Sequence, residues 1–248
     1  MNRYLRAAAV ATLATAGSLS AHAGELSGNI AYTTDYRFRG ISQTDRDFAI
    51  QGGFDYAWDA GFYAGTWASN VDNFAPNPID GSAGAQTEID VYAGYTHALT
   101  DRWALGFNVL YFYYPGASTA GGQAEINYIE YTPEISYAGD AFDAGFSIAY
   151  SPDFYAESGD AFYYNASVGL PLADFLTLGL HAGYQTIDDN KAWGTPDYAD
   201  WSVALSTSQL GLDWSLAYVD TDLSESECFG GGDICDATAV ATVSKSFP

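Results

Sequence analysis

Basic residues are scarce in this sequence of 248 residues. It holds 8 Lys and Arg against 31 Asp and Glu, which gives a formal net charge of −23 at pH 7. Such a charge repels a phosphate backbone, so nucleic acid is excluded as a partner. Acidic chains are often disordered, but aromatic residues make up 16% of this one and supply ample surface to bury. We therefore expect a folded protein whose carboxylates stay in contact with water.

Long hydrophobic runs are also missing, apart from one near the N-terminus. Two arginines precede an apolar stretch at residues 7–19, and an A-x-A triplet ends at Ala23. This layout is typical of a secretory signal peptide, and the stretch is shorter than the roughly 18 to 20 residues that a spanning helix needs. We predict that residues 1–23 are a cleaved signal peptide and that residues 24–248 are one exported domain. An N-terminal helix of the mature protein is the alternative.

Cysteine is almost absent, with Cys228 and Cys235 in one Gly-rich stretch. In an exported chain, this spacing predicts a disulfide that clips a loop. A pair of metal ligands is the weaker alternative because no His or third Cys lies nearby. The acidic stretches at 188–189 and 220–222 lack the spacing of a calcium loop, so they indicate a solvated rim. We expect no metal site and no cofactor.

Apolar and polar residues alternate with a period of two along most of the chain, which predicts β-strands. The first strand is expected to run from residue 26 to residue 39, with apolar residues on one face and Asp35, Arg37 and Arg39 on the other. The strand at residues 63–71 is ambiguous in its facing. Connections alternate between short turns and longer acidic or Gly/Pro-rich loops. Six long and five short connections give twelve strands, with both chain ends on the short-turn side, as in bacterial outer-membrane barrels.

The predicted strands of about 9 to 13 residues suit a tilted crossing of a bilayer. Inside hydrocarbon, every backbone N–H and C=O needs a partner, and only a sheet closed on itself leaves no edge. We therefore predict an all-β fold, a transmembrane up-and-down antiparallel β-barrel with apolar faces towards lipid. A secreted β-sandwich is the alternative, disfavoured because its strands are usually about 5 to 6 residues long. Aromatic residues also gather towards strand ends, where a membrane interface would place them.

Three segments carry a family resemblance: YRFRGISQT at residues 36–44, GFYAGTWASNVD at 61–72 and EIDVYAGY at 88–95. In these segments the chain resembles the TorF family of proteobacterial outer-membrane proteins, which are classed as porins. The resemblance implies an outer-membrane barrel with a pore, and it transfers no substrate and no catalytic residue. Phe247 is followed by Pro248, whereas such barrels usually end on the aromatic residue that the insertion machinery reads.

The polar strand faces carry a set of candidate pore-lining residues, mostly acidic, which are Asp35, Arg37, Arg39, Asp55, Glu88, Asp90, Glu130, Glu134, Asp143, His181 and Asp213. Rings of carboxylates in a narrow passage lower the electrostatic barrier for cations. This favours a porin that passes small hydrophilic solutes and prefers cations. The alternative is a barrel with an adhesive or structural role, in which the two arginines pair with carboxylates and fill the narrow lumen.

An enzyme is a further class, and the sequence disfavours it. Only His97 and His181 remain after signal cleavage, no G-x-S-x-G motif occurs, and the serines are scattered without a nearby base. We expect the protein in the outer membrane of a Gram-negative bacterium. Its expected partners are outer-membrane lipid, lipopolysaccharide, small solutes, and the barrel-insertion machinery through the C-terminal strand.

Overall fold

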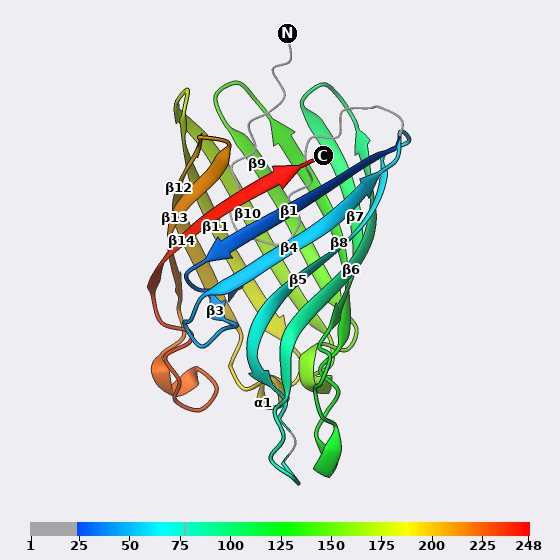
Figure 1. Ribbon diagram of the computed structural model, residues 1–248, viewed down its shortest axis with the longest axis vertical. Helices are drawn as coiled ribbons and strands as arrows, with labels where there is room; N and C mark the ends of the chain where they lie inside the picture. Colours follow the sequence, from blue (N-terminus) through cyan, green and yellow to red (C-terminus); the bar gives the residue numbers. More distant parts are fainter. Residues whose placement is uncertain (1–23, 77) are drawn as a thin grey trace.

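The structure is a computed structural model that describes residues 24–76 and 78–248 (Figure 1). The predicted signal peptide lies outside the described residues. Within those residues, no helix is long and apolar enough to cross a membrane. The helical pieces are short and lie in connections: η1 (Ala120–Gly122), η2 (Tyr155–Glu157), α1 (Asn190–Trp193) and η3 (Glu225–Glu227).

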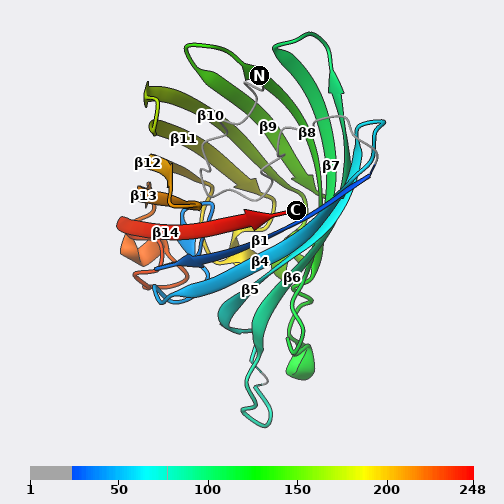
Figure 2. The same ribbon diagram turned by 45° about the horizontal axis from the view of Figure 1, so that its top comes forward.

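Twelve antiparallel strands close into a barrel, which confirms the predicted fold class (Figures 1 and 2). Each strand pairs with its neighbours in the chain, and β1 pairs with β14 to close the sheet. The strands are β1 (Glu25–Thr33), β4 (Ala49–Ala57), β5 (Phe62–Phe74), β6 (Ala85–Ala98), β7 (Trp103–Tyr113), β8 (Tyr128–Ala138), β9 (Asp143–Ser151), β10 (Ala161–Ala173), β11 (Leu176–Ile187), β12 (Tyr198–Gln209), β13 (Leu212–Thr221) and β14 (Thr238–Phe247).

The connections alternate in length as the sequence predicted. Short turns join β4 to β5, β6 to β7, β8 to β9, β10 to β11 and β12 to β13, and they lie together at the upper end of Figure 1. The longer loops, with their short helical turns, lie at the opposite end. We call these the turn end and the loop end. Strands of 9 to 14 residues separate them, a length that suits a tilted crossing of hydrocarbon.

Large apolar side chains cover the outside of the barrel. Leu26, Phe54 and Leu216 are exposed by 57 to 59%, while the polar residues beside them on the same strands point inward. Because the sheet closes on itself, no other sheet within the described residues faces these side chains, and the small sheet of residues 37–42 lies on the inner side. The sandwich alternative is therefore wrong, and the outer surface is the apolar band that a membrane barrel presents.

β5, whose facing was ambiguous from sequence, carries aromatic residues on both sides. Phe62 is exposed on the outer surface, whereas Trp67 lies inside and meets the ring of Tyr36 with centroids 5.4 Å apart. The ring of Tyr63 lies inside too, over the backbone of Gly94 in β6. A strand with aromatic residues on both faces gives no polarity signal, which is why alternation alone left its orientation open.

The prediction for the first strand is wrong at its C-terminal end. β1 stops at Thr33, and residues 34–47 turn into the barrel instead of continuing along its wall. We call this segment the inner hairpin; it contains the two-stranded sheet of β2 (Arg37–Phe38) and β3 (Ile41–Ser42). Asp35 explains the turn, because its carboxylate accepts hydrogen bonds from Ser42 Oγ at 2.6 Å and Arg37 Nε at 2.6 Å, which ties the two arms together.

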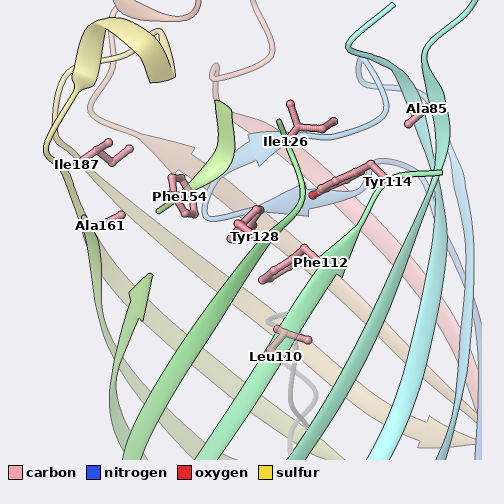
Figure 3. Close-up of a cluster of buried hydrophobic side chains, with 9 residues drawn as sticks. All are labelled: Ala85, Leu110, Phe112, Tyr114, Ile126, Tyr128, Phe154, Ala161 and Ile187. Carbon is pink, nitrogen blue, oxygen red and sulfur yellow. The ribbon is translucent and has the colours of Figure 1, made fainter. Parts of the chain in front are cut away.

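At the loop end, apolar side chains of several strands meet inside the barrel (Figure 3). Phe112 and Tyr128 stack with centroids 4.3 Å apart, Phe154 packs against Tyr128, and Phe38 of the inner hairpin lies edge-on to Phe112. These four residues, three from β2, β7 and β8 and one from the connection that leads into η2, are the centre of the inner aromatic cluster. Towards the turn end, the inward positions carry mainly Gly, Ser and Ala. The described conformation is therefore tightly packed in its loop-end half.

Candidate functional site

Arg39 lies at the tip of the inner hairpin, where its backbone adopts a left-handed φ of 49°. Its guanidinium reaches the barrel wall: Nη2 donates to both carboxylate oxygens of Glu130 at 2.7 Å, and Nη1 donates to Gln185 Oε1 at 2.6 Å. The same group lies over the rings of Phe38 at 4.6 Å and Tyr163 at 4.2 Å. One buried cation thus joins the hairpin to β8, β10 and β11.

Arg37 anchors the other side of the hairpin. Its Nε donates to Asp35 at 2.6 Å, and its Nη1 donates to the carbonyl oxygens of Gly40 at 3.0 Å, Ile234 at 2.7 Å and Asp236 at 3.1 Å. The last two belong to the connection between β13 and β14. Arg37 and Arg39 were predicted to line the interior from a strand; they do lie inside, but they reach it through a loop that has folded inward.

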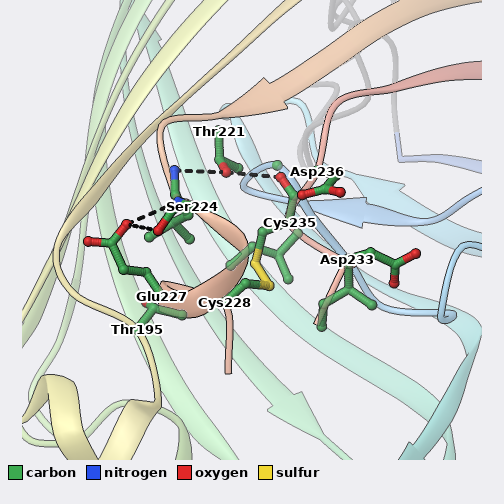
Figure 4. Close-up of a disulfide and its surroundings, with 12 residues drawn as sticks. Thr195, Thr221, Ser224, Glu227, Cys228, Asp233, Cys235 and Asp236 are labelled. Atoms are coloured by element: carbon green, nitrogen blue, oxygen red, sulfur yellow. Dashed lines mark hydrogen bonds between the residues drawn. A yellow bond between two sulfur atoms is a disulfide. The ribbon is translucent and has the colours of Figure 1, made fainter. Parts of the chain in front are cut away.

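The connection from residue 222 to residue 237, here called the clipped loop, carries the predicted disulfide between Cys228 and Cys235 (Figure 4). Thr221 Oγ1 donates to the carbonyl of Cys235 at 3.0 Å, and the backbone N–H of Ser42 donates to the carbonyl of Ile234 at 2.9 Å. A capping box closes η3: the side chain and backbone of Ser224 hydrogen-bond to Glu227 and lower the pKa of its carboxyl. The clipped loop is therefore a folded platform against which the inner hairpin rests.

Carboxylates without an arginine partner surround this arrangement. Glu88 accepts a hydrogen bond from Tyr36 Oη at 2.7 Å. Asp90 is fully buried, and within the described residues neither of its carboxylate oxygens has a hydrogen-bond partner. Trp67 and Phe112 stand opposite Asp90 on the two neighbouring strands. The interior therefore keeps acidic side chains that no arginine pairs with.

His181 belongs to a second polar group, with Tyr163 and Asp200. Tyr163 Oη lies 3.1 Å from His181 Nε2 and donates to Asp200 Oδ2 at 2.9 Å, while His181 Nδ1 lies 3.5 Å from Asp200 Oδ1. The strand register corrects one inference from sequence, because Ser167 and Ser202 stand directly opposite His181. Both ring nitrogens nevertheless face Tyr163 and Asp200, so the imidazole is not placed to activate either serine.

The four predicted carboxylates that have not yet been described lie towards the turn end, away from the two arginines. Asp55 accepts from Tyr92 Oη at 2.5 Å, and Asp213 accepts from Ser208 Oγ at 2.5 Å. Glu134 covers Gly106 of β7, and Asp143 accepts from the backbone N–H of Gly139 at 3.2 Å. The predicted set thus divides into two groups. Asp35, Arg37, Arg39, Glu88, Asp90, Glu130 and His181 form the loop-end group, and these four carboxylates form the turn-end group.

Sequence reasoning missed four interior residues that contact the loop-end group. Asp200 and Gln185 alternate with outward-facing residues on β12 and β11, so period two contained the signal for both. Tyr36 was predicted to face lipid on an extended first strand, and this is wrong because the inner hairpin carries it inside. Tyr163 was placed on the polar face without a role. Within the described residues, no group of three or more His, Cys, Asp or Glu is arranged to hold a metal ion.

Comparison with known proteins agrees with this architecture. A family model described as a bacterial protein of unknown function (Gcw_chp) matches residues 15–247. No curated protein matches the chain in sequence. The TorF name is not part of the family description, so that assignment stays a prediction.

Three solved structures with similar folds are outer-membrane channels. The KdgM porin in complex with disordered oligogalacturonate has a TM-score of 0.57 at 8% identity, over 90% of this chain and 99% of that one. The NanC porin has a TM-score of 0.55 at 11% identity, over 90% and 100%. An outer-membrane channel from Pseudomonas putida F1 has a TM-score of 0.54 at 10% identity, over 92% and 97%. Identities this low show a shared fold alone.

Proposed function

The chain belongs to the Gcw_chp family of bacterial proteins of unknown function, and from that premise and its porin-like fold we propose that it is an outer-membrane channel for small hydrophilic solutes that prefers cations. It crosses the outer membrane with its short turns on the periplasmic side and its long loops outside, as bacterial barrels do. Lipid and lipopolysaccharide surround it, and the barrel-insertion machinery acts on its last strand.

One observation supports the cation preference: the interior holds more acidic side chains than basic side chains that could pair with them. Arg37 and Arg39 form ion pairs with Asp35 and Glu130, respectively. Glu88, Asp90 and Asp200 remain in the same half of the barrel without a basic partner other than His181 beside Asp200. A low-dielectric wall strengthens the field of such charges and raises the local concentration of cations. An anion such as oligogalacturonate, which is bound in the KdgM porin complex, would be repelled.

The inner hairpin and the inner aromatic cluster make this a gated channel. Because the loop-end half is packed in the described conformation, solutes pass only when the hairpin leaves its place. Its ties are polar and aromatic side-chain contacts with the wall and hydrogen bonds with the clipped loop, and these can break and re-form without disturbing the strand pairs. The strands supply a rigid frame, and the hairpin is the part that moves.

Planar-bilayer recording tests this function. In a tenfold KCl gradient, the purified barrel is expected to show rare openings, and the reversal potential of the open state should favour K⁺ over Cl⁻. Replacing Glu88, Asp90 and Asp200 together by their amides should move the reversal potential towards zero. Asp140→Asn is the matched control, because this side chain is 93% exposed on the turn-end surface and does not line the interior.

A structural or adhesive barrel with a permanently filled lumen is the second candidate. The observation in its favour is the packing of Phe112, Tyr128 and Phe154, which are exposed by 4% or less. The same recording separates the two candidates, because a plugged barrel conducts in no condition, including after the hairpin contacts are removed. An anion-selective open state would contradict the proposed charge preference while leaving a channel in place.

A further inference from the structure

The pocket that holds the Arg39 guanidinium has the groups that recognise a free organic cation. Glu130 contributes a carboxylate, Gln185 an amide oxygen and Tyr163 a ring face at 4.2 Å, and all three side chains are at most 5% exposed. Phe154 adds a second ring at 5.8 Å. These four groups belong to the wall and its loops, not to the inner hairpin. They would therefore stay in place if the hairpin moved out.

The wall residues are held in the orientation that a cation requires. Gln185 Nε2 donates to the carbonyl oxygens of Phe162 at 3.3 Å and Thr186 at 3.2 Å, which directs the amide oxygen towards the pocket. Tyr163 donates its hydroxyl to Asp200, so its ring presents a fixed face. A carboxylate and aromatic ring faces together bind guanidinium and ammonium groups through charge-assisted hydrogen bonds and cation–π attraction.

The acidic side chains around the pocket outnumber the one arginine that pairs there. Asp90 is fully buried, has no hydrogen-bond partner within the described residues, and lies on the strand two positions from Glu88. A cation bound here would give this buried acid the partner that it lacks, so this region favours an added positive charge. The donor set suits an organic cation better than a metal ion, because a hard cation takes six or more oxygen ligands in place of ring faces.

We propose that this pocket binds the guanidinium or ammonium group of the solute and that Arg39 occupies it as a tethered competitor. The inference rests on the proposed channel function, since the solute reaches the pocket through the lumen. Arg39 then has two roles: it closes the hairpin against Glu130 when no solute is present, and it is displaced when a cationic solute takes its contacts. The solute class is a small amine or guanidine compound.

Removing the competitor should expose the binding site. A short tether gives Arg39 an effective concentration in the millimolar range or above, which a free solute must overcome. Arg39→Ala is therefore expected to bind methylguanidinium at least about tenfold more tightly than the unaltered barrel does. Methylurea, which has a similar shape and no charge, should bind neither protein. Isothermal titration calorimetry on the folded barrel in detergent measures both ligands.

Glu130→Gln in the Arg39→Ala background should abolish the gain, because it removes the carboxylate that receives the cation. Arg102→Ala is the matched control: this arginine pairs with Asp140 on the turn-end surface, with side chains 55% and 93% exposed, and its loss should leave binding unchanged. If Arg39→Ala fails to fold, as judged by its heat-modifiable migration, Arg39→Gln replaces it.

Equal binding of methylguanidinium and methylurea to the folded Arg39→Ala barrel would overturn the proposal, and so would tight binding that survives Glu130→Gln. Calorimetry does not require conduction, so these outcomes are independent of the bilayer recording. A barrel that binds methylguanidinium but never conducts would remove the channel function and keep the pocket. A barrel that conducts but does not bind methylguanidinium would overturn the pocket proposal and leave the channel function standing.

Discussion

Arg39 is the residue on which the interior depends most, because its guanidinium is the only group that joins the hairpin tip to Glu130 and Gln185 among the described contacts. A buried ion pair contributes little net stability relative to apolar residues, but breaking one partner leaves an uncompensated charge. The arrangement is consequently sensitive to single substitutions on either side.

Glu130→Gln is expected to lower the free energy of unfolding by about 3 kcal/mol, because the Arg39 charge stays buried without its carboxylate. The double variant with Arg39→Ala should lose less than the sum of the two single variants, since neither charge then remains unpaired. Urea-induced unfolding of the refolded barrel in lipid vesicles, arranged as a double-mutant cycle, measures the coupling.

The exposed pair of Arg102 and Asp140 supplies the comparison for that cycle. Solvent screens exposed ion pairs, so Arg102→Ala should leave the urea-unfolding transition nearly unchanged. Additive losses at Arg39 and Glu130 would mean that the two side chains do not interact in the folded protein.

Two elements, the inner hairpin and the clipped loop, are joined directly to each other, in addition to their contacts with the barrel strands. The backbone N–H of Ser42 and the guanidinium of Arg37 both donate to the carbonyl of Ile234, one residue before Cys235. The disulfide joins two cysteines at a sequence separation of 7, and the short loop that it closes contains that carbonyl. Constraining the loop in this way should keep its acceptors in position for the hairpin.

Replacing Cys228 and Cys235 by Ser is expected to destabilise the clipped loop by roughly 2 to 3 kcal/mol, the entropy of a loop of this size. Amide exchange should then quicken in the hairpin at residues 37–42, and bilayer openings should become more frequent. Exchange in β6 to β8 should stay unchanged, because the strand ladders do not involve the loop. A reductant should have the same effect on the unaltered protein and none on the double-Ser variant.

Unchanged hairpin exchange in the double-Ser variant would mean that the clipped loop is not what holds the hairpin.

The sequence indicated the disulfide but not the contact between the clipped loop and the hairpin. Alternation continues from residue 26 to residue 39 without a break, and the hairpin shares the period of the strand before it. A local pattern therefore could not show that the chain leaves the wall at Thr33.

For the whole molecule, the decisive property is that apolar side chains face outward and polar ones inward. Leu216 and Ser215 are neighbours near the middle of β13, with Leu216 57% exposed on the outer surface and Ser215 facing the interior. The two positions share depth, strand and backbone environment. They therefore make a matched pair for testing which side meets lipid.

Leu216→Lys is expected to lower stability by about 2 to 4 kcal/mol, the cost of a lysine facing hydrocarbon near the bilayer midplane. Ser215→Lys should cost clearly less, because its ammonium group faces an acidic interior. Folding equilibria in lipid vesicles measure both. If Ser215→Lys lowered stability more than Leu216→Lys did, the assignment of the outward and inward faces of the sheet would be wrong.

The sequence by itself determined the strand number, the alternation of short and long connections, the sense of the two faces and the disulfide. These properties rest on local signals, since period two and turn composition are read over a few residues. Only the tertiary structure decided that residues 34–47 enter the lumen, that Arg39 pairs with Glu130, and which carboxylates stay unpaired. Those contacts join residues far apart in the sequence, such as Tyr36 with Glu88 at 52 positions and Arg37 with Ile234 at 197 positions, and they exist only once the sheet has closed.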